Sequence, residues 1–155
     1  GSTGLPPVDD AINQTNQFGY AHHIQRLMVL SNAMLLCEIH PGDVHTWFME
    51  QFVDSAEWVM EANVYDMGQY ATGGLFATKP YISSSNYITK MSDYDDGDWT
   101  DEWDALYWSF LDKHYDTLQD NHRMGLMLSH VDRKTNEELT ALHEQADAVK
   151  DRLTA

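Results

Sequence analysis

Two adjacent histidines and a nearby arginine are the residues of this sequence best suited to chemistry. They are His22, His23 and Arg26, in the run GYAHHIQRLMV. Histidine titrates near neutral pH and can move a proton, while arginine keeps its positive charge and suits an anionic ligand. Residues three and four apart lie on the same side of a helix, so a ligand above a helical run here would meet all three. Taken alone, the histidines are also compatible with ordinary solvated or hydrogen-bonded helix residues.

A second group of polar side chains follows at helical spacing. Asp54, Glu57, Trp58 and Glu61 recur at intervals of three and four residues, so a helix would place them on one face. Acids at this spacing most often form a solvated face. The alternative is that one of the carboxylates faces Arg26 from an antiparallel helix and forms an ion pair with it.

The elements that would position these groups are two long helices. The first is predicted to run from about Asp9 to His40, where Pro41 and Gly42 end it. Its apolar residues recur at helical spacing and no proline interrupts it; they are Ile12, Phe18, Ala21, Ile24, Leu27, Met28, Ala33 and Leu35. Asp43 is a plausible N-cap for a second helix through about Glu61, antiparallel to the first.

The rest of the chain predicts a long irregular segment and two more helices. Glycines, serines and aromatic residues from Asn63 to Lys90 follow neither helical nor strand spacing, and long irregular segments in compact domains are usually functional. An acidic tract at 93–104 precedes a short helix expected around 105–118, and a capping-box pattern at 135–138 opens a last helix. The prediction is an all-α fold with negligible strand content. Residues 5–155 would form one small helical domain, with residues 1–4 as an expression tag or a linker.

Composition limits the classes of function. The chain has 155 residues and a formal net charge of −16, which repels nucleic acid over most of its surface. Its single cysteine, Cys37, excludes an internal disulfide and is compatible with a cytoplasmic location. We expect no targeting segment and no membrane span, because no apolar stretch approaches about 20 residues.

Two segments carry a resemblance to a known family. The run at 19–29, together with ATKPYISSSNYITKMSDY at 77–94, resembles the flavin-binding C-terminal part of the iron–sulfur bacterial cryptochromes and (6-4) photolyases, which repair ultraviolet-damaged DNA with light. The resemblance implies FAD as cofactor. It implies that His22 and His23 contact the lesion and move a proton, and that Trp47 relays electrons to the flavin. It also implies an Arg26–Asp54 ion pair beside the isoalloxazine ring. The implied cofactor-binding residues are Arg26, Asp54, Glu57, Asn63, Gly73, Lys79, Ser83, Ser84 and Asn86.

The sequence departs from this family in two respects. The resemblance runs from about Leu5 to His130 and covers the last third of the full-length enzymes, so we expect the antenna-binding domain to be missing and a second copy of the chain to be able to close the flavin site. The four cysteines that hold the family's iron–sulfur cluster correspond to Pro7, Asp95, Asp98 and Asp101, so we expect no cluster. The acids that remain indicate a solvated acidic loop more than a metal site.

Two functions from different classes follow from the resemblance. The first is an FAD-dependent, deoxyribodipyrimidine photolyase-like lyase that repairs (6-4) or cyclobutane photoproducts by electron transfer from reduced FAD. Single-stranded DNA is the expected substrate, because an extruded base costs little to reach there. The alternative is a cryptochrome-like photosensor without repair activity, which the acidic surface favours. A degenerate fragment that keeps the fold but not the flavin is a third reading.

Overall fold

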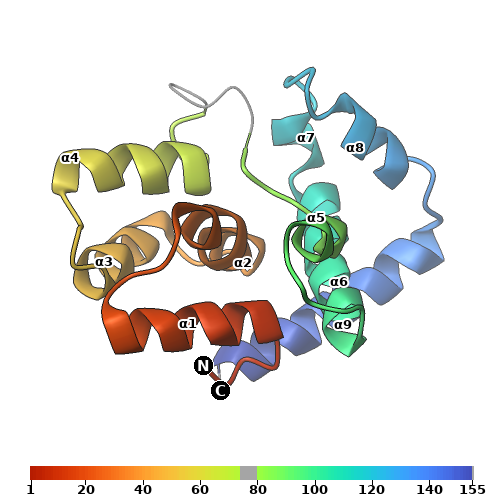
Figure 1. Ribbon diagram of the computed structural model, residues 1–155. Helices are drawn as coiled ribbons and strands as arrows, with labels where there is room; N and C mark the ends of the chain where they lie inside the picture. Colours follow the sequence, from red (N-terminus) through yellow and green to blue (C-terminus); the bar gives the residue numbers. More distant parts are fainter. Residues whose placement is uncertain (74–79, 155) are drawn as a thin grey trace.

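The protein is described here by a computed structural model that covers residues 1–73 and 80–154, and those residues form helices without any strand (Figure 1). This confirms the predicted all-α class. Within these ranges the chain contains α-helices and two π-helical segments, η1 and η2. In order they are α1 Pro6–Phe18, η1 Gln25–Ser31, α2 Asn32–Leu36, α3 Pro41–Gln51, α4 Glu57–Met60, η2 Glu61–Gly68, α5 Ser85–Met91, α6 Asp98–Lys113, α7 Tyr115–Leu118, α8 Gly125–Val131 and α9 Asn136–Thr154.

The prediction of one helix from about Asp9 to His40 was wrong, because the helix ends at Gly19. This residue has a φ of 61° and its N–H donates to the carbonyl of Thr15 at 2.7 Å, which ends α1. Glycine adopts this left-handed conformation at little cost, so it is a common helix terminator. The apolar spacing continues across the break because both pieces face the same core. As a result, His22 lies in the connection before η1 and not on the face of a helix.

The second long helix is also broken. Pro41 occupies the first turn of α3, and the His40 side chain accepts a hydrogen bond from the N–H of Gly42 at 3.1 Å. His40 is therefore the N-cap that was predicted at Asp43, since proline is well suited to the first helical position. The segment 52–56 is not helical, and the chain then continues through α4 and η2 to Gly68.

The irregular segment is shorter than the predicted 63–90. Its start belongs to η2, and its end belongs to α5, which begins at Ser85. The following helix, α6, starts at Asp98 and not near residue 105, so part of the acidic tract is helical. Asp98 and Asp101 lie in the first turn of α6, where the helix dipole favours negative charge.

The helices form two groups in Figure 1, with α1, α3 and α4 on one side and α5 to α8 on the other, while α9 runs from the second group toward the chain ends below α1. The segments η1 and α2 lie between the two groups: η1 packs against α1 and η2, and α2 packs against α6. The core contains large side chains that are at most 1% exposed; they are Leu30, Leu36, Phe48, Trp103, Leu106 and Leu111. The two chain ends lie close together, and the Arg152 guanidinium is next to Gly4.

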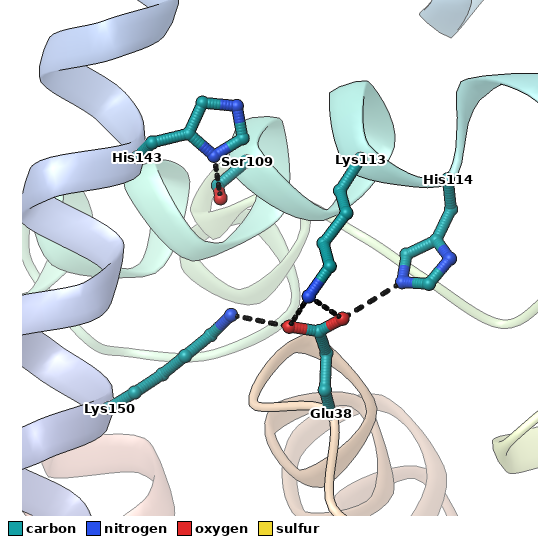
Figure 2. Close-up of polar contacts among 6 residues, drawn as sticks. All are labelled: Glu38, Ser109, Lys113, His114, His143 and Lys150. Atoms are coloured by element: carbon teal, nitrogen blue, oxygen red, sulfur yellow. Dashed lines mark hydrogen bonds and ion pairs between the residues drawn. The ribbon is translucent and has the colours of Figure 1, made fainter.

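The last helix, α9, confirms the predicted capping box. The Thr135 N–H donates to Glu138 at 2.7 Å, and the Glu138 N–H donates to the Thr135 hydroxyl at 3.2 Å. The helix then packs along α6, where His143 is 2.7 Å from the Ser109 hydroxyl (Figure 2). Across the described ranges, no helix is long and apolar enough to cross a membrane.

Candidate functional site

Arg26 is a buried cation whose guanidinium contacts a backbone carbonyl, a carboxylate and two aromatic rings. The residue is 7% exposed, and its Nε donates to the carbonyl of Ala21 at 2.7 Å. Its two terminal nitrogens contact the Asp54 carboxylate at 2.9 and 3.1 Å, one to each oxygen. The guanidinium carbon lies 4.0 Å from the Phe52 ring centre and 4.9 Å from that of Tyr20. A planar arginine fits this combination of two parallel hydrogen bonds and aromatic stacking, whereas lysine does not.

The carboxylate partner is exposed on its other side. The side chain of Asp54 is 50% exposed, and hydrogen bonding from Arg26 keeps the pKa of this carboxyl below its usual 3.8. Asp54 therefore remains ionised at neutral pH while part of its accepting capacity faces outward. The ion pair expected from the sequence forms, but Asp54 reaches Arg26 from the non-helical connection after α3 and not from a helix face.

A backbone hydrogen bond joins the two connections from which Arg26 and Asp54 are positioned. The N–H of Val53 donates to the carbonyl of Gly19 at 2.9 Å, which links the connection after α1 to the connection after α3. Two features favour glycine at position 19. Its φ is positive, and an added Cβ would lie 2.6 Å from the Val53 side chain. This hydrogen bond places Tyr20 and Phe52 around Arg26.

The two histidines lie beside Arg26 in the chain but do not form the shared helix face that was predicted. Both are exposed, and His22 begins the turn that leads into η1. The His22 N–H donates to the side chain of Gln25 at 3.0 Å, and its Nδ1 accepts from the N–H of Ile24 at 3.3 Å. His22 therefore acts as a local cap with its ring at the surface. The proposed proton transfer by His22 and His23 stays a prediction.

Trp47 is connected to the ion pair through an aromatic contact. Its ring is half-buried on α3 and meets Phe52 edge to face, with 5.9 Å between the ring centres. Because Phe52 also stacks on Arg26, aromatic rings lead from Trp47 to the guanidinium. The role of Trp47 as an electron relay is a prediction that this contact does not test.

The remaining predicted cofactor contacts lie on several elements. Glu57 is exposed at the start of α4, Asn63 is half-buried in η2, and Gly73 is exposed with a φ of 71°. Lys79, and with it the Lys-Pro-Tyr motif in part, lies outside the described residues. None of these contacts is assigned to a cofactor by the geometry alone.

The serine-rich segment has a structural use that the sequence did not predict. Ser83 is buried, and its hydroxyl and carbonyl accept hydrogen bonds from Asn32 at 3.0 and 3.2 Å. Its carbonyl also accepts from the indole N–H of Trp103 at 3.0 Å, so Ser83 ties α2 to α6. Ser84 is the residue before α5, and Asn86 is exposed beside a cavity that several aspartates line. The hydroxyl and carbonyl oxygens of Ser83 therefore both accept hydrogen bonds within the protein.

Two residues of this site were missed in the sequence. Tyr20 and Phe52 contact the Arg26 guanidinium with their rings. Phe52 was predicted as an apolar residue of the second helix, because apolar spacing indicates core packing and does not reveal a contact with a cation. In the parts of the chain that the structure describes, no group of three or more His, Cys, Asp or Glu side chains could hold a metal ion.

The comparisons with known proteins define the protein family to which the chain belongs. Residues 1–126 match the family model described as the FAD binding domain of DNA photolyase. The chain therefore belongs to the photolyase FAD-binding-domain family.

Two relatives illustrate the range of this family. Over 135 residues the chain is 43% identical to a (6-4) photolyase of Agrobacterium fabrum, with 81% of this chain and 27% of the relative covered. Over 108 residues it is 49% identical to an uncharacterised protein of Acanthamoeba polyphaga mimivirus, with 69% of this chain and 86% of that protein covered. The chain thus spans about a quarter of the length of the A. fabrum photolyase.

Proposed function

We propose that this chain binds FAD next to the Arg26–Asp54 pair and uses it for light-driven repair of pyrimidine photoproducts in DNA. The observation that carries the proposal is the fixed guanidinium of Arg26 with a half-exposed carboxylate beside it, in a chain of the photolyase FAD-binding family. The free side of Asp54 suits a ring N–H donor, and the buried positive charge suits an electron-rich flavin ring. These two features fit the cofactor.

The chain's own residues have separate tasks in this proposal. Bound and reduced FAD supplies the electron that light drives into the photoproduct. Arg26 stabilises negative charge on the ring, and Asp54 orients the ring by accepting its N–H. His22 and His23 are exposed beside this pair, and they donate and recover a proton at the lesion because an imidazole nitrogen can either donate or accept a proton. Glu57, Asn63, Gly73, Lys79, Ser84 and Asn86 remain proposed further contacts to the cofactor.

The finer features of the proposal follow from charge and composition. With a net charge of −16, the chain meets the least repulsion on single-stranded DNA, where a lesion is also easily extruded. With one cysteine it lacks the thiolates that an iron–sulfur cluster needs. The exposed side of Asp54 fits a flavin site that is either open to solvent or closed by a second copy of the chain. The protein is proposed to act in the cytoplasm.

Photosensing without repair is the second candidate function. The acidic surface favours it, since a protein partner tolerates negative charge better than DNA does. In this case the flavin site is the same and the two histidines have no catalytic role.

The first experiment measures flavin binding. The purified protein is mixed with FAD, and retained flavin is read from the absorption spectrum after gel filtration, which also reports any change of oligomeric state. Arg26→Met removes the cation and leaves Asp54 uncompensated, so we expect loss of the retained flavin. His122→Ala, at an exposed histidine of another surface, is the matched control. Full retention of FAD by Arg26→Met would show that this placement is wrong.

The second experiment separates repair from sensing. Single-stranded oligonucleotides with a (6-4) or a cyclobutane photoproduct are illuminated with blue light at low ionic strength, with the flavin reduced. His22→Ala and His23→Ala should retain FAD and lose repair, whereas His122→Ala should retain both. A flavin-loaded parent that repairs neither photoproduct would leave the photosensor as the function.

A further inference from the structure

Three exposed apolar side chains form a patch where the connections after α1 and α3 meet. They are Phe18, Tyr20 and Val53, with exposed fractions of 62%, 46% and 82%. Phe18 and Tyr20 flank Gly19 in the chain, and the Val53 side chain packs directly against Gly19 while its N–H donates to the Gly19 carbonyl at 2.9 Å. The patch lies at the end of the molecule opposite α7 and α8 in Figure 1.

The size of this apolar patch is that of the centre of a small interface. A fully exposed aromatic side chain presents about 150–250 Å², so the three side chains together expose about 300 Å². Monomeric soluble proteins rarely expose much larger contiguous apolar patches, and patches of this size are often functional. With a polar rim, two partners would bury about 1,000 Å² in total, which is the low end for a specific interface.

The charge around the patch favours contact between two copies of the chain. Residues 11–37 are the longest run without Asp or Glu, although the whole chain has 25 acids. The carboxylate next to Val53, that of Asp54, is paired with Arg26. Two chains with a net charge of −16 repel each other over most of their surface, so they approach with the least repulsion through this patch.

The chemistry of the patch favours a second copy over other partners. Nucleic acid binding depends on exposed Lys and Arg, but Arg26 is the only Lys or Arg in residues 1–78, and it is buried against Asp54. A basic protein would be attracted to the acids elsewhere on the surface. The border of the patch has exposed donors, His22 and His23, and a half-exposed acceptor, Asp54. In a two-fold contact each copy presents the same surface, so the donors of one copy can meet the acceptor of the other.

We propose that Phe18, Tyr20 and Val53 form the centre of a two-fold interface with a second copy of this chain. Val53 directly precedes Asp54, and Tyr20 lies on Arg26, so the same contact covers the exposed side of the ion pair. The second copy then forms a wall of the flavin site, a consequence that rests on the proposed function. The interface itself does not depend on flavin.

Sedimentation velocity of the full chain without FAD tests the interface. We expect a reversible dimer with a Kd of about 10–100 µM, as suits a small interface. Added salt should strengthen the dimer, because it screens the repulsion between two acidic chains. A chain that stays monomeric up to about 500 µM in about 0.5 M salt would overturn the proposal.

Two lysine substitutions locate the interface. Val53→Lys places a charge from each copy at the centre of the contact and should raise the dimer Kd about tenfold or more. Leu126→Lys, at a position on α8 that is 65% exposed, makes the same change of net charge and should change the Kd by less than about twofold. Equal Kd values for the two variants would overturn the proposal. Phe18→Ser, at the exposed last residue of α1, decides the matter if Val53→Lys does not fold.

Adding FAD separates this inference from the proposed function. If the second copy covers Asp54, FAD should lower the dimer Kd about fivefold, because coupling between two binding events is reciprocal. A dimer that depends on Val53 but does not respond to bound FAD would retain the interface and refute its closure of the flavin site. A parent that dimerises but retains no FAD would refute the proposed function alone.

Single-stranded DNA is the other occupant that the experiment can reveal. Binding of an undamaged single-stranded oligonucleotide is measured by fluorescence anisotropy for the parent, Phe18→Ser and Leu126→Lys. If the chain stays monomeric and Phe18→Ser loses oligonucleotide binding, the patch is a platform for bases and the proposal is wrong. Equal oligonucleotide binding by the parent and Phe18→Ser, together with the Val53-dependent dimer, supports the interface.

Discussion

Replacing Glu38 with glutamine should measure how strongly its contacts with Lys113, His114 and Lys150 fasten the end of α2 to α6 and α9. Burial alone would raise the pKa of Glu38, but hydrogen bonds from Lys113, Lys150 and His114 outweigh it and lower the pKa from 4.5 to about 2. That drop is equivalent to about 3 kcal/mol, at about 1.4 kcal/mol per pKa unit. The side chain is 25% exposed, so solvent screening reduces the expected contribution to about 2 kcal/mol.

The pH dependence of this effect has a definite sign. A carboxyl with a lowered pKa in the folded state stabilises the fold above its unfolded pKa, and the stabilisation is lost as pH falls through the folded value. The difference in unfolding free energy between the parent and Glu38→Gln should therefore be constant above about pH 5 and shrink between 4.5 and about 2. Urea unfolding followed by tryptophan fluorescence at several pH values measures it.

Two controls make this test specific. Glu50→Gln removes a charge from an exposed position on α3 and should change the unfolding free energy by less than about 0.5 kcal/mol. The reasoning about Glu38 is refuted if Glu38→Gln costs no more than Glu50→Gln at pH 7. It is equally refuted if the cost stays the same at low pH.

Three further substitutions test the packing and the caps. In Gly68→Ala the new Cβ would lie 2.2 Å from the Ser31 hydroxyl, which is itself hydrogen-bonded, so thermal unfolding should show a loss of about 2 kcal/mol or more. Thr135→Ala removes one half of the capping box and should cost about 1 kcal/mol in urea unfolding, with Thr140→Ala as a control on the same helix. Trp103→Phe removes the buried indole donor to the Ser83 carbonyl and should lower the free energy of unfolding in urea by about 2 kcal/mol. An unchanged urea midpoint would show that this hydrogen bond contributes nothing to stability.

The helical class could be predicted because it depends on local signals, whereas the Arg26–Asp54 ion pair joins residues 28 positions apart and was expected from the resemblance to a known family. Apolar residues at helical spacing and the capping box at Thr135 act over a few residues, and helices form where these patterns predict them. The ends of the helices were predicted less well. Gly19 has the φ that terminates α1, yet the apolar spacing on either side of it is continuous, so spacing alone gave one helix in place of two.

Contacts between distant segments could not be read from the sequence. The family resemblance implied that Ser83 contacts a cofactor, which stays a prediction, but nothing in the sequence indicated that its oxygens accept hydrogen bonds from Asn32 and Trp103. The cluster around Glu38 joins residues up to 112 positions apart, and no spacing rule connects them. Such contacts depend on how α2, α6 and α9 pack, which local patterns do not encode.

The π-helical form of η1 sets the helical phase between two parts of the molecule. Arg26, near its beginning, is paired with Asp54, and Asn32, directly after its end, donates to Ser83. Removing one residue between them would rotate the downstream part about the helix axis. Asn32 would then face away from Ser83 even if Arg26 kept its partner. The number of residues between Arg26 and Asn32 must therefore stay the same. An insertion or deletion between them would prevent the Arg26–Asp54 ion pair and the Asn32–Ser83 hydrogen bonds from forming together.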